Sequence, residues 1–115
     1  MIEAEDAVNY DALGALRSVL GLEFADLIRD FNEQMATGLA RMEFALAQQD
    51  SARIRSIAHT LKGSALSLHC KPLADCCARV ERGADQLAVG NEGSLLEDLR
   101  DSVRATVRAI DDWIG

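Results

Sequence analysis

Apolar residues recur at steps of three and four through almost the whole chain, and this spacing is the strongest constraint on its fold. At about 100° per residue, such steps place the apolar side chains on one face of an α-helix. No segment shows the alternation that a half-buried strand would require. The spacing and its interruptions predict five helices, at residues 10–20, about 23–48, from a cap at Asp50 to about 68–70, from Pro72 to Gly90, and from a capping box at Ser94 and Glu97 to Ile114.

Four long amphipathic helices joined by short loops most simply pack as an antiparallel up-down-up-down four-helix bundle, with the short first helix covering one end. We therefore predict an all-α fold. Residues 1–115 are predicted to form a single domain, because a chain of 115 residues can bury one core but not two. The composition agrees with this fold, since 49% of the residues are hydrophobic, only 4% are aromatic and one is proline.

His59 is predicted to point away from the core. It lies about 140° from the centre of the apolar stripe that contains Ile54 and Leu61. Its neighbours on the outer face of the helix are the residues three, four and seven positions away. These neighbours are Arg55, Lys62, Gly63 and Leu66. An exposed imidazole therefore has a cation one turn away and a position without a side chain beside it.

The run His59-Thr60-Leu61-Lys62-Gly63-Ser64 resembles the H-x-L-K-G-S signature of histidine phosphotransfer (HPt) domains, which act in multistep two-component phosphorelays. The resemblance covers nearly the whole chain and implies the same bundle fold. It also implies that His59 accepts a phosphoryl group from a receiver-domain aspartate and passes it to another receiver domain. Lys62 would be the electrostatic partner of His59, and Gly63 and Ser64 would belong to the surface that meets the receiver.

Two details near the signature stay open. Ser64 is a candidate to stabilise the phosphoryl group, but its hydroxyl could equally bond to a carbonyl one turn earlier. Many members of the family carry a small Gly-Ala-like pair shortly after the signature, whereas this chain has His69-Cys70 there. The shape of the turn after the helix is therefore an open question.

Four residues are predicted to form the docking surface for the partner: Arg55, Gly63, Leu66 and Phe44. A glycine inside a helix costs about 1 kcal/mol relative to alanine, and close approach of a partner is a physical reason to keep Gly63. Phe44 lies about 160° from the apolar stripe of the second helix. The turn at Asp50 would bring it near the level of Ser56, so docking and simple drift of a long helix explain Phe44 equally well.

The charge distribution also points to the third helix. No acidic residue occurs between Ser51 and Ala74, whereas this segment carries four of the 12 basic residues. We expect an electropositive strip that suits a phosphoryl group and an acidic partner pocket. The net charge of −7 argues against nucleic acid as the main partner, because phosphate backbones require a basic surface.

The expected chemistry needs little from this chain beyond positioning. A neutral imidazole nitrogen is a competent nucleophile near neutral pH, and phosphoryl transfer depends mainly on positioning and electrostatic stabilisation. The chain has no glycine-rich nucleotide loop and no evident carboxylate cluster for Mg²⁺. We therefore expect a phosphoryl carrier with no nucleotide site and no cofactor of its own. By resemblance, the partner receiver domain supplies the aspartate and the Mg²⁺.

The sequence does not favour a metal site, and it does not favour a membrane or secreted location for the protein. His69, Cys70, Cys76 and Cys77 match no usual metal-ligand spacing, so we expect no metal site and a packing role for the cysteines.

No apolar run is long enough to span a membrane and no signal segment opens the chain, so we expect a cytoplasmic monomer without membrane contact. Its expected partners are receiver domains of response regulators or hybrid sensor kinases.

Two other functions remain as alternatives. The chain could be a helical interaction module with the same fold but no phosphoryl transfer, which a damaged signature would favour. It could also be a fragment of a sensor kinase. Kinase dimerisation histidines are typically followed by an acidic residue, whereas Thr60 follows His59 here, so the kinase fragment fits poorly.

Overall fold

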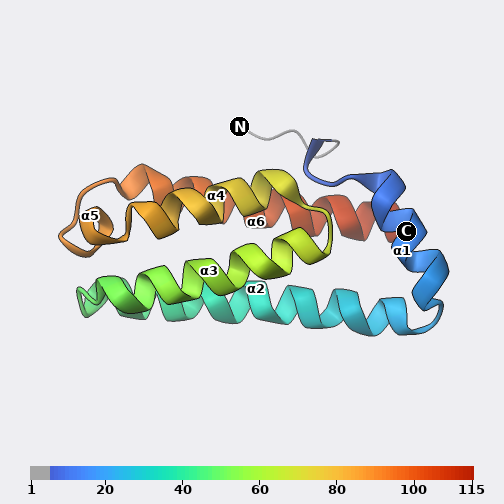
Figure 1. Cartoon of the computed structure of the whole chain (residues 1–115), viewed down its shortest axis with the longest axis horizontal. Coiled ribbons are helices and arrows are strands. Elements are labelled where there is room, and N and C mark those ends of the chain that lie inside the picture. Colours follow the sequence, from blue (N-terminus) through green and yellow to red (C-terminus); the bar gives the residue numbers. More distant parts are fainter. Residues whose placement is uncertain (1–5) are drawn as a thin grey trace.

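The computed structural model describes residues 6–115, so the first five residues of the predicted domain lie outside the described residues. The helices are α1 (Tyr10–Leu20), α2 (Glu23–Ala47), α3 (Ser51–Ser67), α4 (Lys71–Arg82), α5 (Ala84–Ala88) and α6 (Gly93–Ile114). Helices α2, α3, α4 and α6 form an antiparallel bundle, and α1 lies across one end of it (Figure 1). This arrangement confirms the predicted fold class.

The predicted apolar stripes supply most of the core, although Val19 in α1 is exposed. In α3, Ile54, Ala58, Leu61 and Ala65 are buried, and the side chains on the opposite face of the helix are exposed. The described helices show no candidate membrane span, since none is both long and apolar enough.

Helices α2 and α3 approach each other closely at Gly38. A Cβ atom at this position would lie 2.6 Å from Leu61 Cδ2, which is too close for unstrained packing. The missing side chain therefore lets Leu61 pack directly onto the backbone of α2. Because Leu61 is fixed inward in this way, the residue two positions earlier in α3, His59, is held on the outer face.

The end of the bundle beneath α1 is closed by an aromatic cluster. The ring of Trp113 lies 6.2 Å from that of Tyr10 and 6.0 Å from that of Phe24. The guanidinium of Arg17 stacks over Trp113, 5.3 Å from the ring centroid. These contacts join α1, α2 and the last turn of α6, which accounts for the predicted position of the first helix.

Helix α3 begins and ends through local hydrogen bonds. The side chain of Asp50 accepts a hydrogen bond from Arg53 N at 3.0 Å, which confirms the predicted cap. At the other end, His69 adopts φ = 59° and Cys70 N donates to Ala65 O at 2.9 Å. This is the left-handed helix ending that glycine usually provides. The turn therefore forms although the chain has His69-Cys70 in place of a small pair.

The predictions for the last two helices need three corrections. The helix predicted from Pro72 to Gly90 is interrupted at Gly83, and the chain forms α4 and the short α5 instead. Glycine is the least favourable residue inside a helix after proline, and here a Cβ atom would lie 2.7 Å from Leu95 Cδ1. The capping box at Ser94 does not form, because α6 already begins at Gly93 after Glu92 turns the chain with φ = 61°. The apolar spacing of the last helix predicts an inward position for Ile114, but this last residue of α6 is exposed.

Candidate functional site

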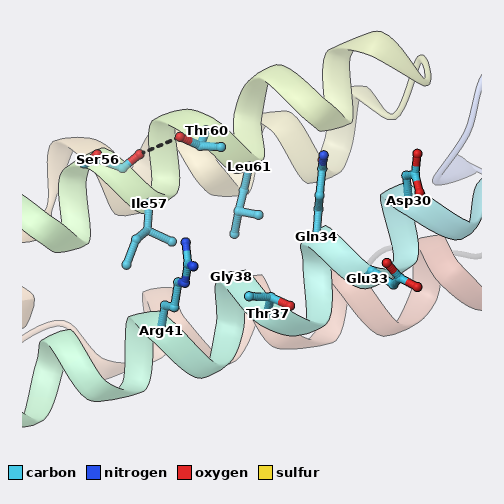
Figure 2. A pocket seen from close by; sticks show the side chains of 10 residues that line it. All are labelled: Asp30, Glu33, Gln34, Thr37, Gly38, Arg41, Ser56, Ile57, Thr60 and Leu61. Atoms are coloured by element: carbon cyan, nitrogen blue, oxygen red, sulfur yellow. Dashed lines mark hydrogen bonds between the residues drawn. The ribbon is translucent and has the colours of Figure 1, made fainter. Parts of the chain in front are cut away.

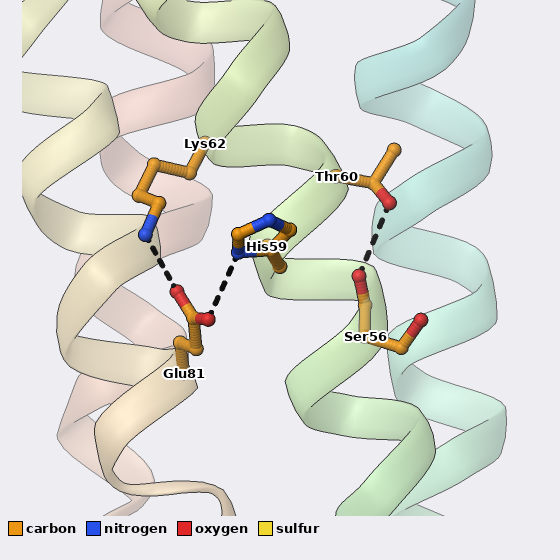
Figure 3. A network of polar contacts seen from close by, with 5 residues as sticks. All are labelled: Ser56, His59, Thr60, Lys62 and Glu81. Atoms are coloured by element: carbon orange, nitrogen blue, oxygen red, sulfur yellow. Dashed lines mark hydrogen bonds and ion pairs between the residues drawn. The ribbon is translucent and has the colours of Figure 1, made fainter.

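The imidazole of His59 projects from the middle of α3 into solvent, as its position on the helix predicts. Its side chain is 67% exposed. Lys62 lies on the side of α3 that faces α4, whereas Ser56 and Thr60 lie on the side that faces α2 (Figure 3). The histidine therefore stands on a ridge between two neighbouring helices.

A carboxylate from α4 joins His59 to Lys62. Glu81 Oε2 lies 3.0 Å from His59 Nδ1, and Glu81 Oε1 accepts a hydrogen bond from Lys62 Nζ at 2.9 Å. The Glu81 side chain is only 23% exposed, which makes it the least exposed member of this triad. One carboxylate thus fixes both functional side chains of the signature.

The protonation of Glu81 determines which nitrogen of His59 is free. The hydrogen bond from Lys62 lowers the pKa of the Glu81 carboxyl, and the bond to His59 lowers it further against the opposing effect of partial burial. At neutral pH the carboxylate is therefore ionised and can only accept hydrogen bonds. His59 must then donate from Nδ1, so that a neutral imidazole presents the lone pair of Nε2 to solvent.

Glu81 was not identified from the sequence. It belongs to a helix whose visible pattern is its buried stripe, and no motif marks it. One signal was available, because His59 and Glu81 each lie 11 residues from Cys70, at the turn between α3 and α4. Two antiparallel helices that fold back at such a turn bring residues at equal distances from it to the same level.

The expected electropositive strip on α3 does not exist as a set of free charges. Each of its four cations forms an ion pair with an acid from outside the acid-free segment. These pairs are Arg53 with Asp50, Arg55 with Asp85, Lys62 with Glu81, and Lys71 with Asp75. The sequence pattern was correct, but the fold supplies the missing acids from the helix ends and from α4 and α5.

Ser64 lies away from the triad of His59, Lys62 and Glu81. Its hydroxyl donates to Gln34 Oε1 on α2 at 2.6 Å and also lies 3.4 Å from Thr60 O, the carbonyl one turn earlier. Five positions separate it from His59, which places the two side chains about 140° apart around the helix. A contact between Ser64 and a group on His59 remains a prediction.

The predicted docking residues occupy two regions. Gly63 and Leu66 lie on α3 with His59, where a Cβ atom at Gly63 would meet nothing within 4 Å and Leu66 is 54% exposed. Phe44 is 60% exposed but lies near the turn between α2 and α3, beside a hollow that Arg53 also lines. Arg55 is held by Asp85 Oδ1 at 2.9 Å.

The three cysteines are free thiols inside the bundle. Burial raises the pKa of Cys70 to about 12, and burial is also the main reason why the pKa of Cys77 is about 12. This agrees with the predicted packing role. In residues 6–115, no three histidine, cysteine, aspartate or glutamate side chains are grouped so that they could hold a metal ion.

Comparisons with known proteins agree with this geometry. The family model of the Hpt domain matches residues 26–113. The solved structure of histidine-containing phosphotransfer protein B (HptB) from Pseudomonas aeruginosa PAO1 is similar, with a TM-score of 0.81 and 20% sequence identity over 92% of this chain and 93% of that chain. At this identity the likeness shows a shared fold. No curated protein that was compared with the sequence matches it significantly.

The lowered pKa of Glu81 predicts a pH-dependent contribution to stability. The folded-state pKa lies below the ordinary value of 4.5, so the contribution is fully present above about pH 4.5 and is lost as the pH falls through the lower folded-state value. Glu81→Gln removes the titrating group. We expect the difference in thermal midpoint between the wild-type protein and Glu81→Gln to be largest at neutral pH and to shrink on acidification.

Glu97→Gln is the matched control, because it removes an exposed carboxyl of α6 that has no ion pair in the described chain. A difference between the wild-type protein and Glu81→Gln that stays constant from neutral pH to pH 3 would contradict the assigned pKa shift.

Proposed function

This chain belongs to the Hpt domain family, and from that premise we propose that His59 is the residue at which it accepts and donates the phosphoryl group. Proteins of this family transfer phosphoryl groups in two-component phosphorelays, in which they act with receiver domains. The proposal rests on the exposed imidazole of His59, which is held at Nδ1 by Glu81 and has no hydrogen-bond partner at Nε2 in the described residues.

The transfer step follows from this geometry. Nε2 attacks the phosphorus of a receiver aspartyl phosphate, a nitrogen–phosphorus bond forms, and the bond from phosphorus to the aspartate oxygen breaks. The proton on Nδ1 stays in its hydrogen bond with Glu81, which stabilises the positive charge that develops on the imidazole. The reverse step returns the phosphoryl group to a second receiver. Exposure of Nε2 supports this role, because a charged phosphohistidine would be costly to bury.

Lys62 supplies positive charge close to the reacting nitrogen. The transition state is loose and spreads negative charge over the phosphoryl oxygens, so a nearby ammonium stabilises it. In the resting protein the ammonium is held by Glu81, at 2.9 Å, rather than by solvent. Glu81 therefore keeps Lys62 within reach of the site, and the incoming phosphoryl oxygens compete with Glu81 for it.

The remaining requirements come from the partner. We propose that the receiver domain provides the aspartate and the Mg²⁺, and that the chain has no nucleotide site of its own. We also propose that it acts as a cytoplasmic monomer that binds neither membranes nor nucleic acid. The alternative of a helical module without phosphoryl chemistry is not favoured, because a module of that kind has no need for a carboxylate that orients an exposed histidine.

The first functional prediction concerns the nucleophile. Incubation with a phosphorylated receiver domain should give an acid-labile, base-stable adduct on His59. His59→Gln should abolish this adduct while leaving the helical circular dichroism unchanged, because the side chain is exposed. The measurement is mass spectrometry of the intact and digested protein.

His69→Gln is the matched control, since glutamine already adopts the same left-handed backbone at Gln49 with φ = 54°. This variant should be labelled normally. Labelling at His69 instead of His59, or autophosphorylation of the purified chain with ATP alone, would contradict the assignment.

The second prediction concerns Gly63, where stability and transfer should change in opposite directions. A side chain there would enter open space, so Gly63→Leu should raise the stability of the fold by up to about 1 kcal/mol through better helix propensity. The same side chain would fill the space beside His59 that a receiver must enter, so transfer should slow in both directions. The two measurements are the thermal midpoint and the transfer rate.

Ala36→Leu serves as the control, because Ala36 is an exposed position on the face of α2 that points away from α3. It should transfer normally. A Gly63→Leu protein that is more stable and transfers at the wild-type rate would show that the receiver does not approach this face.

A further inference from the structure

A groove runs between α2 and α3 (Figure 2). Two of its lining residues, Ser56 and Thr60, lie on the side of His59 opposite Glu81 (Figure 3). It has a volume of about 450 Å³, and its lining includes Gly38 and Leu61, where the Leu61 side chain packs onto the backbone of α2. Thr60, which directly follows His59, and Ser56 line its α3 wall. A molecule that covers the imidazole is therefore adjacent to this groove.

The α2 wall of the groove has opposite charges at its two ends. Asp30 and Glu33 lie toward the beginning of α2 and Arg41 lies toward its end (Figure 2). Eleven residues separate Asp30 from Arg41, which corresponds to about 16 Å along the helix and returns to nearly the same face. All three side chains are exposed, and none forms an ion pair or hydrogen bond within residues 6–115.

On the side of His59 that faces α4, the basic side chains of α3 have ion-pair partners. Arg55 is paired with Asp85 at 2.9 Å, and Lys62 is paired with Glu81 at 2.9 Å. These charges already have partners across the contact between α3 and the α4–α5 segment. Of the two sides of the histidine, the groove is therefore the one that presents unpaired charges of both signs to an incoming molecule.

We propose that this groove selects the receiver domain, by taking a receiver segment that directs a basic side chain toward Asp30 and Glu33 and an acidic side chain toward Arg41. The inference rests on the proposed function and adds a determinant of partner choice to it. Unpaired charges at the edge of an interface set the association rate and exclude partners with the opposite arrangement, while the chemistry at His59 is common to all receivers.

The test compares Arg41→Glu with the wild-type protein in transfer from a set of purified phosphorylated receiver domains. For the receiver that reacts fastest with the wild-type protein, we expect the rate at subsaturating concentration to fall about tenfold. The rates of the two proteins should converge at high salt, where exposed charges are screened. Arg108→Glu makes the same charge change at an exposed position of α6 and should transfer like the wild-type protein.

The acidic end is tested with the double variant Asp30→Lys and Glu33→Lys, which should also change the order in which the receivers react. Equal rates for Arg41→Glu and the wild-type protein with every receiver would overturn the proposal. An equal loss in Arg108→Glu would also overturn it, because the effect would then reflect net charge alone. A change in self-association without a change in transfer would assign the groove to a second copy of the chain and overturn it as well.

Direct phosphorylation by phosphoramidate separates this proposal from the function on which it rests. This small donor needs no docking surface, so it should label His59 in the wild-type protein and in every groove variant. Failure to label His59 in the wild-type protein would contradict the proposed function itself. Normal labelling combined with unchanged receiver selectivity would contradict only the role of the groove.

Discussion

The hydrogen bonds of Glu81 to two residues of α3 are the interaction on which the site depends. One carboxylate oxygen lies 3.0 Å from His59 Nδ1 and the other lies 2.9 Å from Lys62 Nζ. An exposed histidine and a long lysine side chain would otherwise sample many rotamers, and ordering them has an entropic cost. The carboxylate is presented by a packed helix and is itself partly buried, so the bundle supplies the rigidity that the histidine and lysine side chains lack.

The same contact links the fold to the chemistry. The hydrogen bond from Lys62 lowers the pKa of the Glu81 carboxyl further below neutral pH. The ionised carboxylate can only accept, so the proton of a neutral imidazole is directed to Nδ1. The opposite nitrogen then faces solvent, where a receiver can reach it. On this side Arg55 and Lys62 have partners within the molecule, whereas the charged side chains that line the groove between α2 and α3 have no ion pair in the described residues. Glu81 thus orients the nucleophile from the α4 side of α3, while the groove proposed to select the partner lies on the α2 side.

Most of the fold follows from the apolar periodicity, because burial of one helical face dominates the packing. This explains why the ends of α1 and α3 and the exposure of His59 were predictable from the sequence. Features that depend on contacts between helices could not be predicted from the sequence. At Gly83, where α4 ends, Leu95 packs so closely that a side chain would not fit, and Ser64 bonds to Gln34, which is 30 positions away. Glu81 itself becomes recognisable only when α3 and α4 are aligned about their common turn.

The role of Glu81 is tested most directly by the protonation of the His59 imidazole, measured by ¹⁵N nuclear magnetic resonance at a pH where the ring is neutral. We predict that Nδ1 carries the proton in the free protein, that the phosphoryl group appears on Nε2 after transfer, and that Glu81→Gln weakens the preference for this tautomer. A proton on Nε2 in the free protein, or a phosphoryl group on Nδ1, would contradict the orientation of His59 by Glu81.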